Sequence, residues 1–330
     1  MKSGLTFKKI IAILSAAVIG LHLAFRNNYN VMHKVSVLFV TPLRQLQSKI
    51  ASFFPFSLAE ALMAVVLVWI IWSIAKKRWK KLLTGAVTLS LFVWAAFSLM
   101  WGTYYYGTPV KSTSPVSDSQ LAVVTAYFAD LTNKSYRDEP SKDEIIEKSK
   151  ELNDGIGCKG IVFSKVMSLV DFSGFFFPPT GEANVNLDMP SHDLAATCAH
   201  EIAHLNGIPT EQEANFEAVR TSLEFGDEDY IYSASLMAYS YLGNALHDEN
   251  YELWCSIYWS LSEEVRQDLT ETSEYWAKYK TPVKEVSNVV YENFLYSNGQ
   301  ELGLKSYGAC VDLLVNYYYD TALEYFMEMA

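Results

Sequence analysis

Residues 194–205 read LAATCAHEIAHL and contain the pattern His-Glu-x-x-His. No proline or glycine interrupts this segment, so we expect one continuous helix, which Ser191 or Asp193 can cap at its start. His200 and His204 are four residues apart and therefore project from the same face of that helix. The segment thus predicts a helix that presents two imidazoles side by side.

Two imidazoles on one helix face suit a single Zn²⁺ ion. Glu201 points towards the same cleft, where its carboxylate can take a proton from water and pass it to a leaving group. The alternative is a helix with two surface histidines. The apolar flanks argue against it, because buried paired histidines need partners. We therefore predict a zinc site formed by His200 and His204, with Glu201 as the general base.

A third ligand is expected just beyond this helix. Gly207 ends the helix and Pro209 prevents its continuation. Thr210 can cap the next helix, and with Glu213 three residues on it matches the capping-box pattern. If Glu213 is used in that way, Glu211 is freer to bind the metal, and three protein ligands leave one position for water.

The ligand assignment keeps one alternative open. Glu211 is favoured, but Glu213 with Glu217 one turn later is a competing choice. The glutamate that is not used would be an ordinary acidic residue at a helix start, where the helix dipole favours negative charge. Asn215 stands four residues after Glu211 on the same face, so it is expected to orient a histidine ligand.

Three apolar runs lie in the first third of the chain, at about 7–25, 58–75 and 82–101. A helix of about 20 mostly apolar residues can cross a bilayer. The second and third runs meet this length with Glu60 as their only charge. The first run is shorter and follows a basic start, so it is either a retained span, which we favour, or a signal peptide. The sequence thus predicts three transmembrane helices.

The basic block at 76–81 predicts the orientation of these spans. Short basic loops remain in the cytoplasm, so everything after Trp101 is expected outside, although the external segment 26–57 also carries scattered basic residues. The predicted location is a cell membrane, with several spans and an extracytoplasmic domain. The alternative, buried core helices in a soluble protein, is disfavoured.

Charge separates the anchor from the rest of the chain. The chain has 26 basic residues (Lys and Arg) and 37 acidic residues (Asp and Glu). Residues 1–101 hold 12 of the basic residues and one of the acidic residues, so 14 basic and 36 acidic residues remain for the rest of the chain. Such asymmetry indicates two parts in different environments. An acidic domain is a poor partner for phosphate, so the sequence predicts the lipid bilayer as a partner and no nucleic acid.

The predicted fold class is mainly α, with a small β-sheet. Residues 1–101 form the anchor, 102–119 a linker rich in Ser, Pro and Thr, and 120–330 one helix-rich domain. Helical periodicity marks the segments 120–132 and 141–152.

A short strand is expected after the turn at 178–181, because Ala183 and Val185 alternate with Asn184 and Asn186. It is either a plain structural strand or an edge strand that pairs with an extended peptide substrate. On the second interpretation, Ala183, Asn184 and Val185 bind substrate.

The four cysteines, Cys158, Cys198, Cys255 and Cys310, match no zinc-ribbon or Cys-x-x-Cys spacing. Disulfides are permitted outside the membrane. Their pairing does not follow from the sequence, and four free buried thiols are an alternative.

Three motifs together resemble a known family. They are PPTGEANVN at 178–186, the His-Glu-x-x-His pattern, and EQEANF at 211–216, followed by SYG at 306–308 and VDLL at 311–314. The glutamate segment is similar to the third-ligand helix of gluzincin metallopeptidases, among them the membrane-embedded CAAX-processing and heat-shock-type proteases, and to ImmA/IrrE-type peptidases. Most of the chain resembles the bacterial membrane protein family "domain of unknown function 3810". The resemblance implies a zincin-like metallopeptidase domain but no known substrate.

The sequence departs from the gluzincin pattern in two ways. The gap from His204 to Glu211 is shorter than in most gluzincins, and Gly207 is more typical of metzincins. A third histidine ligand is absent, since Thr210 holds that position. We also expect Tyr307 to donate a hydrogen bond to the oxyanion of a tetrahedral intermediate.

The sequence therefore predicts a membrane-anchored zinc metallopeptidase that uses Zn²⁺ and acts on a peptide or protein substrate. Two alternatives remain. One is a receptor or structural protein whose ectodomain is stabilised by zinc, and the other is a zinc amidase that acts on non-peptide substrates. A structural zinc site would usually have four protein ligands and no need of Glu201.

Overall fold

The computed structural model describes residues 7–109, 111, 113–297 and 306–329, although not the side chains of residues 294 and 306–309. The chain is mainly helical and divides into two compact units. One unit is Met1–Pro109 with Phe177–Glu182, and the other is Val110–Phe176 with Ala183–Ala330.

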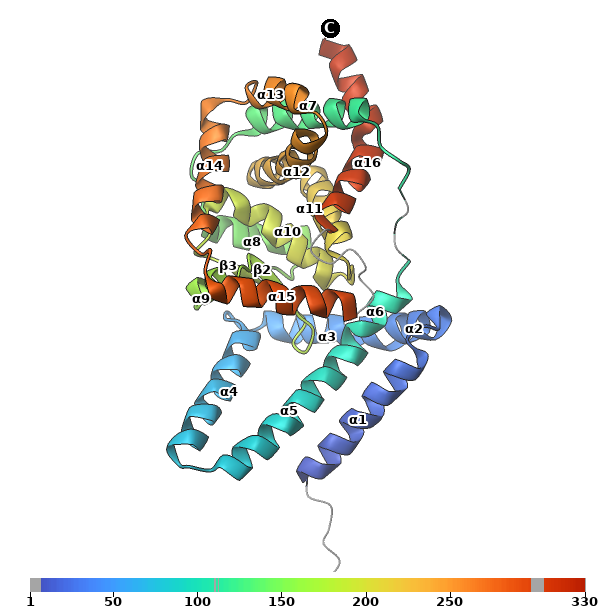
Figure 1. Ribbon diagram of the computed structural model, residues 1–330, viewed down its shortest axis with the longest axis vertical. Coiled ribbons are helices and arrows are strands. Elements are labelled where there is room, and N and C mark those ends of the chain that lie inside the picture. Colours follow the sequence, from blue (N-terminus) through green and yellow to red (C-terminus); the bar gives the residue numbers. More distant parts are fainter. Residues whose placement is uncertain (1–6, 110, 112, 298–305, 330) are drawn as a thin grey trace, which may run out of the picture. The chain divides into compact units, whose positions relative to one another are not determined.

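Three helices of the first unit, coloured blue to teal in Figure 1, are long and apolar enough to cross a membrane within the described residues. They are α1 (Phe7–Phe25), α4 (Leu58–Ala75) and the stretch Trp79–Gly107, which contains α5 (Trp79–Met100) and α6 (Gly102–Gly107). Apolar side chains are exposed along all three, as expected of helices that face lipid. The three predicted runs are thus confirmed as helices, and the third begins three residues earlier than expected.

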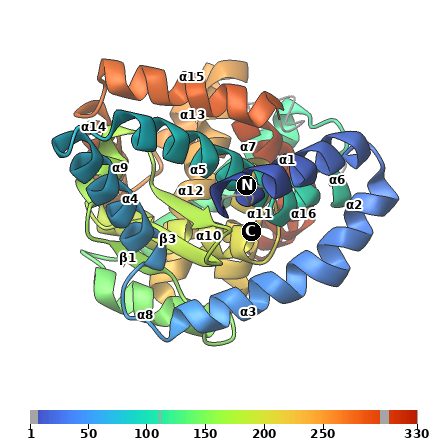
Figure 2. The ribbon, with the colours of Figure 1, turned by 90° about the horizontal axis from the view of Figure 1, so that it is seen from below.

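The segment between α1 and α4, to which the sequence assigned no structure, is also helical. It contains α2 (Tyr29–Val35), a π-helical turn (Ser36–Val40) and α3 (Thr41–Ser52), which follow one another along nearly one line in Figures 1 and 2. Residues 102–107, expected to be part of a linker, form α6 instead.

The segment Phe177–Glu182 packs with the first unit although it lies far along the chain. Ser48 Oγ donates to the carbonyl oxygen of Gly181 at 2.7 Å, and the two oxygens of Glu182 accept the first two backbone N–H groups of α4, both at 2.9 Å. Gly181 has φ +67°, and a Cβ there would come within 2.7 Å of Ser48 Oγ. These contacts give the Thr-Gly-Glu motif a physical role, because a carboxylate satisfies N–H groups that a helix start leaves unpaired.

The second unit consists mainly of helices, which pack around two hydrophobic cores. Their bounds are α7 (Asp118–Ser135), α8 (Lys142–Leu152), α9 (Ser164–Leu169), α10 (Leu194–Leu205), α11 (Glu211–Phe225), α12 (Glu228–Glu249), α13 (Tyr251–Tyr258), α14 (Glu263–Ala277), α15 (Pro282–Ser297) and α16 (Ser306–Met329). The larger core is formed mainly by α7, α11, α12 and α16, with Phe128, Tyr232 and Leu314 fully buried in it. The helices expected at 120–132 and 141–152 are confirmed as α7 and α8.

A three-stranded sheet completes the second unit. Its strands are β1 (Lys159–Ile161), β2 (Gly174–Phe177) and β3 (Glu182–Asn186), in the order β1-β3-β2. β1 and β3 are parallel, with Lys159 opposite Asn184. The expected strand at residues 183–186 is confirmed, but its interpretation as an edge strand is wrong, because β3 has a neighbour on each side.

The smaller core joins this sheet to α10. Ala183 and Val185 of β3 are fully buried there, together with Leu194, Cys198 and Ile202 of α10. Small and apolar residues on this side of α10 allow close packing, which leaves the histidines on another side. The helix is therefore fixed by its apolar face.

All four cysteines are free thiols. Cys158, Cys198 and Cys310 are buried, and Cys255 is half-buried. The Cys158 thiol donates to the carbonyl oxygen of Cys198. The structure thus agrees with the alternative of free thiols.

Candidate metal centre

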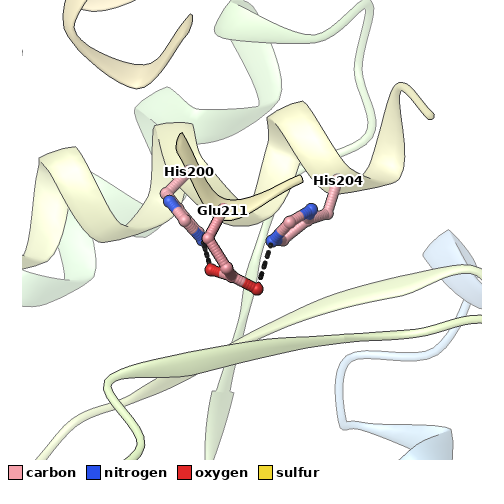
Figure 3. Close-up of side chains that lie close together, drawn as sticks. All are labelled: His200, His204 and Glu211. Carbon is pink, nitrogen blue, oxygen red and sulfur yellow. Dashed lines mark ion pairs between the residues drawn. The ribbon is translucent and has the colours of Figure 1, made fainter. Parts of the chain in front are cut away.

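Helix α10 begins and ends where the sequence predicts and places its two histidines together. Asp193 occupies the N-cap position of α10, although its side chain makes no capping hydrogen bond. The ring centroids of His200 and His204 lie 4.7 Å apart with their planes nearly perpendicular. Both rings project from α10 towards the same carboxylate (Figure 3).

That carboxylate belongs to Glu211, the first residue of α11. Its Oε2 lies 3.3 Å from His200 Nε2, and its Oε1 lies 3.7 Å from His204 Nε2. The three side chains can each offer one ligand atom within 4.8 Å of the others. Ligand atoms at about 2.0–2.2 Å from a tetrahedral zinc ion are separated by roughly 3.3 Å. The spacing of His200, His204 and Glu211 therefore suits one small cation.

The competing glutamates are bound elsewhere. Glu213 accepts the Thr210 hydroxyl at 2.6 Å and the backbone N–H of Lys111 at 2.8 Å. Glu217 pairs with the Lys111 ammonium at 2.5 Å and with Arg220 at 2.6 Å. Among these acids, Glu211 is the one grouped with both histidines.

The expected capping box is not formed at the start of α11. Thr210 occupies the N-cap position, but its hydroxyl donates to the Glu213 carboxylate and accepts no backbone N–H. The Glu213 carboxylate is instead shared between the Thr210 hydroxyl and the backbone N–H of Lys111. Glu213 is therefore occupied, as expected, but by the Thr210 hydroxyl and the Lys111 backbone rather than by a capping box.

The turn after α10 orients His204. Gly207 has φ +93°, a conformation that glycine adopts at little cost. The following residue, Ile208, accepts a hydrogen bond from His204 Nδ1 at 2.7 Å. When the imidazole is neutral, a proton on Nδ1 leaves the lone pair on Nε2, the atom that faces Glu211.

Asn215 was expected to orient a histidine, but the structure gives this role at His204 to the Ile208 carbonyl. Asn215 is buried, and its side-chain nitrogen has no hydrogen-bond partner among the described residues.

Glu201 lies beside this group and is 3 % exposed. Its Oε2 has no hydrogen-bond partner in the described part of the chain. Its other oxygen lies against Gly174 of β2, where an added Cβ would come within 2.5 Å. A buried carboxylate oxygen without a partner is costly and therefore rare, and here it stands next to three ligand-type side chains.

Burial raises the pKa of Glu201 to about 7; Glu211 adds to the rise, and the two histidines oppose it. Burial acts to lower the pKa of His204, but the hydrogen bond to Glu211 and the nearby carboxylates outweigh burial and raise it to about 9. Burial also disfavours ionised Glu211, yet its bonds to both histidines hold its pKa well below the usual range. Without a metal, the group is therefore a carboxylate paired with a protonated imidazole.

The structure adds Tyr291, which the sequence did not reveal. Its hydroxyl donates to Glu211 Oε1 at 2.6 Å, and its ring packs edge-on against Phe172, with the two ring centroids 5.4 Å apart. Tyr291 lies 80 residues after Glu211 and is one of 21 tyrosines, so no local pattern points to it. Tyr307, the expected oxyanion donor, belongs to α16, but its side chain is outside the described part of the chain.

The predicted substrate-binding residues Ala183, Asn184 and Val185 are fully buried in the central strand. They therefore do not form an edge to which a peptide adds. The outer strand next to Glu201 is β2, through Gly174.

The fold and the site define a mainly helical protein with three candidate membrane spans and a possible metal-binding group of two histidines and a glutamate. Residues 36–315 match the model of the family described as Protein of unknown function (DUF3810), and the chain belongs to this family. No curated protein and no solved structure matches the chain. The resemblance in sequence is thus confirmed for the family, whose description names no activity.

Proposed function

We propose that this protein is a membrane-anchored, zinc-dependent hydrolase of the metallopeptidase type. His200, His204 and Glu211 hold the metal, and Glu201 is the general base. One observation carries the proposal: three ligand-type side chains converge beside a buried carboxylate oxygen that has no hydrogen-bond partner among the residues that the structure describes. The ligand group explains why a cation binds, and the unpartnered oxygen of Glu201 explains what the site does with water.

The donor set fits catalytic zinc. Two imidazole nitrogens and one carboxylate oxygen are the ligands of several zinc hydrolases, which keep a further position open. When bound, zinc polarises a carbonyl oxygen and makes water a stronger acid. Structural zinc sites usually have four protein ligands and no adjacent base. The three ligands and Glu201 therefore favour catalysis over a structural role.

The residues of the chain supply the proton transfers. The Glu201 carboxylate accepts one proton as the water oxygen bonds to the substrate carbonyl carbon, and then delivers it to the nitrogen of the breaking C–N bond. In the metal-free protein, burial raises the pKa of Glu201 to about 7, so this carboxyl group can both accept and release a proton near neutral pH. Gly174 leaves room for this carboxylate, which a side chain at that position would displace.

Two further contacts hold the ligands in position. The Ile208 carbonyl fixes the His204 tautomer, and the Tyr291 hydroxyl fixes one oxygen of Glu211. Such outer partners make ligands more basic and limit their rotation.

The proposed substrate is a peptide or protein, and the proposed location is the outer side of a bacterial cell membrane. A helix–turn–helix that contributes His-Glu-x-x-His and a later glutamate supports a zincin-like domain. The three apolar helices support attachment to the bilayer, and the basic residues 76–81 support an external domain.

The proposal is tested on the full-length protein in detergent by metal analysis and by digestion of a broad peptide library read by mass spectrometry. The variants are Glu201→Gln, the ligand variant His200→Ala, and Glu252→Gln, an exposed glutamate in α13, as the matched control. We expect Glu201→Gln to keep the zinc that His200→Ala loses, and to lose hydrolysis by about 10²–10⁴-fold. The control should keep both properties.

Two results would contradict the proposal. One is a wild-type protein whose zinc content does not depend on His200. The other is hydrolysis that is equal in wild type and Glu201→Gln, or absent from wild type loaded with zinc.

A further inference from the structure

We propose a second divalent-metal site in the second unit, formed by His192, Asp268 and Glu271. His192 lies in a short 3₁₀ turn (Ser191–Asp193) immediately before α10, and both acids lie on α14. Each of the three offers a ligand atom within 4.8 Å of the others. This site shares no residue with the proposed catalytic centre and does not depend on its function.

The distance between the two inner ligands has the size that a shared cation requires. His192 Nδ1 lies 3.7 Å from Asp268 Oδ2, too far for a hydrogen bond. Two ligands at about 2.0–2.2 Å from one tetrahedral ion are separated by roughly 3.3 Å. A small approach of the two side chains would therefore place one ion between them.

The neighbours of His192 prepare Nδ1 to bind a metal. The Thr272 hydroxyl donates to Asp193 Oδ2 at 2.7 Å, so its oxygen is the acceptor for His192 Nε2 at 2.8 Å. With its proton on Nε2, a neutral imidazole has its lone pair on Nδ1, which faces Asp268. A histidine linked in this way to a carboxylate is the usual outer arrangement of a metal ligand.

Asp268 is held in place by the core. The Tyr232 hydroxyl donates a short hydrogen bond to Asp268 Oδ2, and Tyr232 itself is fully buried. This oxygen therefore accepts one hydrogen bond from the core side and keeps a lone pair for a cation near His192 Nδ1. Two acceptor atoms facing each other without a proton between them repel, and a cation removes that repulsion.

The third ligand and the access route lie towards solvent. Glu271 is exposed, so its carboxylate can rotate onto an ion without disturbing the core. All three ligands line a cavity of about 570 Å³, together with polar residues such as Arg137, Asp138 and Gln267. The cavity gives a cation and its waters a path to His192, which is otherwise buried.

The ligand set points to the class of metal. The imidazole suits Zn²⁺ and the two carboxylates suit Zn²⁺ or the harder Mn²⁺, whereas soft ions prefer sulfur ligands. An ion bound here links the turn before α10 to α14. It would therefore stabilise the folded protein by binding only to the native state.

The test is titration of the metal-depleted full-length protein with Zn²⁺ and with Mn²⁺, followed by calorimetry and by thermal unfolding. Wild type should bind two Zn²⁺ per chain. His192→Ala should bind one, His200→Ala should keep the one that His192→Ala loses, and His247→Ala, whose imidazole is exposed, should still bind two. Glu271→Gln, at an exposed position that folding tolerates, should weaken this second binding at least tenfold and reduce the rise in Tm that the metal causes.

One equivalent of Zn²⁺ in wild type that is lost only with His200→Ala would overturn the second site and leave the catalytic proposal standing. Two equivalents that persist in both His192→Ala and Glu271→Gln would also overturn it. Loss of both equivalents in His200→Ala alone would show that His192 does not bind metal independently.

Discussion

The two histidine clusters of the second unit differ in what surrounds their ligands. At His200 and His204, the neighbouring acid Glu201 is buried, and one of its oxygens has no hydrogen-bond partner in the described part of the chain. At His192, the neighbouring acid Asp193 is half-buried and accepts a hydrogen bond from Thr272. The acid beside the first cluster thus keeps an oxygen that no described residue binds, whereas the acid beside the second cluster orients His192 through the Thr272 hydroxyl. The difference supports a catalytic role for the first cluster and a stabilising role for the second.

The largest difference is expected between two variants in which each candidate glutamate ligand is replaced separately by glutamine. Glu211→Gln should weaken zinc binding at the first cluster by more than about 100-fold, because even outer partners of zinc ligands contribute about 10–100-fold. Glu213→Gln should change it little, since Glu213 is bound by Thr210 and Lys111. Competition with a zinc chelator measures both. Equal losses in the two variants, or a larger loss in Glu213→Gln, would reverse the assignment.

The first cluster should also bind zinc in competition with protons. In the metal-free protein the pKa of His204 is raised to about 9, so below that pH zinc must displace a proton. Zinc affinity should therefore rise about tenfold per pH unit between pH 7 and 9, where one proton is released.

The stability of the metal-free protein should change in the opposite direction. A histidine whose folded pKa is raised contributes stability that is complete below its unfolded pKa of about 6.5 and is lost as the pH rises through about 9. Chemical unfolding at pH 6, 7.5 and 9, with and without zinc, measures both trends. Stability and affinity that are flat over this range would contradict the proposed pairing of His204 with Glu211.

Removing the Tyr291 hydroxyl tests whether its hydrogen bond holds Glu211 in position to bind zinc. Tyr291→Phe deletes the 2.6 Å hydrogen bond to Glu211 Oε1 and keeps the ring against Phe172. Zinc affinity should fall by about 10–100-fold. Tyr296→Phe, an exposed tyrosine on the same helix, is the matched control. If both variants bind zinc as wild type does, Tyr291 has no part in the centre.

The smallest expected effect concerns the second cluster. Thr272→Val removes the link between His192 and Asp193, so metal binding at the second cluster should weaken by about tenfold. Binding at His200 and hydrolysis should be unchanged. A titration with Zn²⁺ measures binding at the two clusters separately. Weaker zinc binding at the first cluster alone would contradict the role of Thr272 at His192.

Features that depend on neighbouring residues could be predicted from the sequence. The three apolar runs, α10 and the start of α11 follow from periodicity, length and helix breakers, and the two histidines follow from helical spacing. The position of β3 could not be predicted, because its central place depends on β1, which pairs with it from 25 residues away. The local pattern of a strand is the same at the centre and at the edge.

Contacts between distant segments account for the rest. Tyr291 reaches Glu211 from 80 residues away, and Asp268 meets His192 across a similar gap. Lys111, whose backbone binds Glu213, lies 102 residues before it. The sequence therefore favoured Glu211 because of an expected capping box that the structure does not contain. Without those tertiary contacts, no residue pattern identifies the partners of a ligand.

The most direct test of the central claim is X-ray diffraction from crystals of the zinc-loaded protein, measured above and below the zinc absorption edge. We expect an anomalous peak at about 2.0–2.2 Å from His200 Nε2, His204 Nε2 and one oxygen of Glu211. The Glu201 carboxylate should face the coordination position of the zinc that no protein ligand fills. The absence of a peak there in crystals that contain zinc elsewhere would contradict it, as would a peak that Glu211 does not contact.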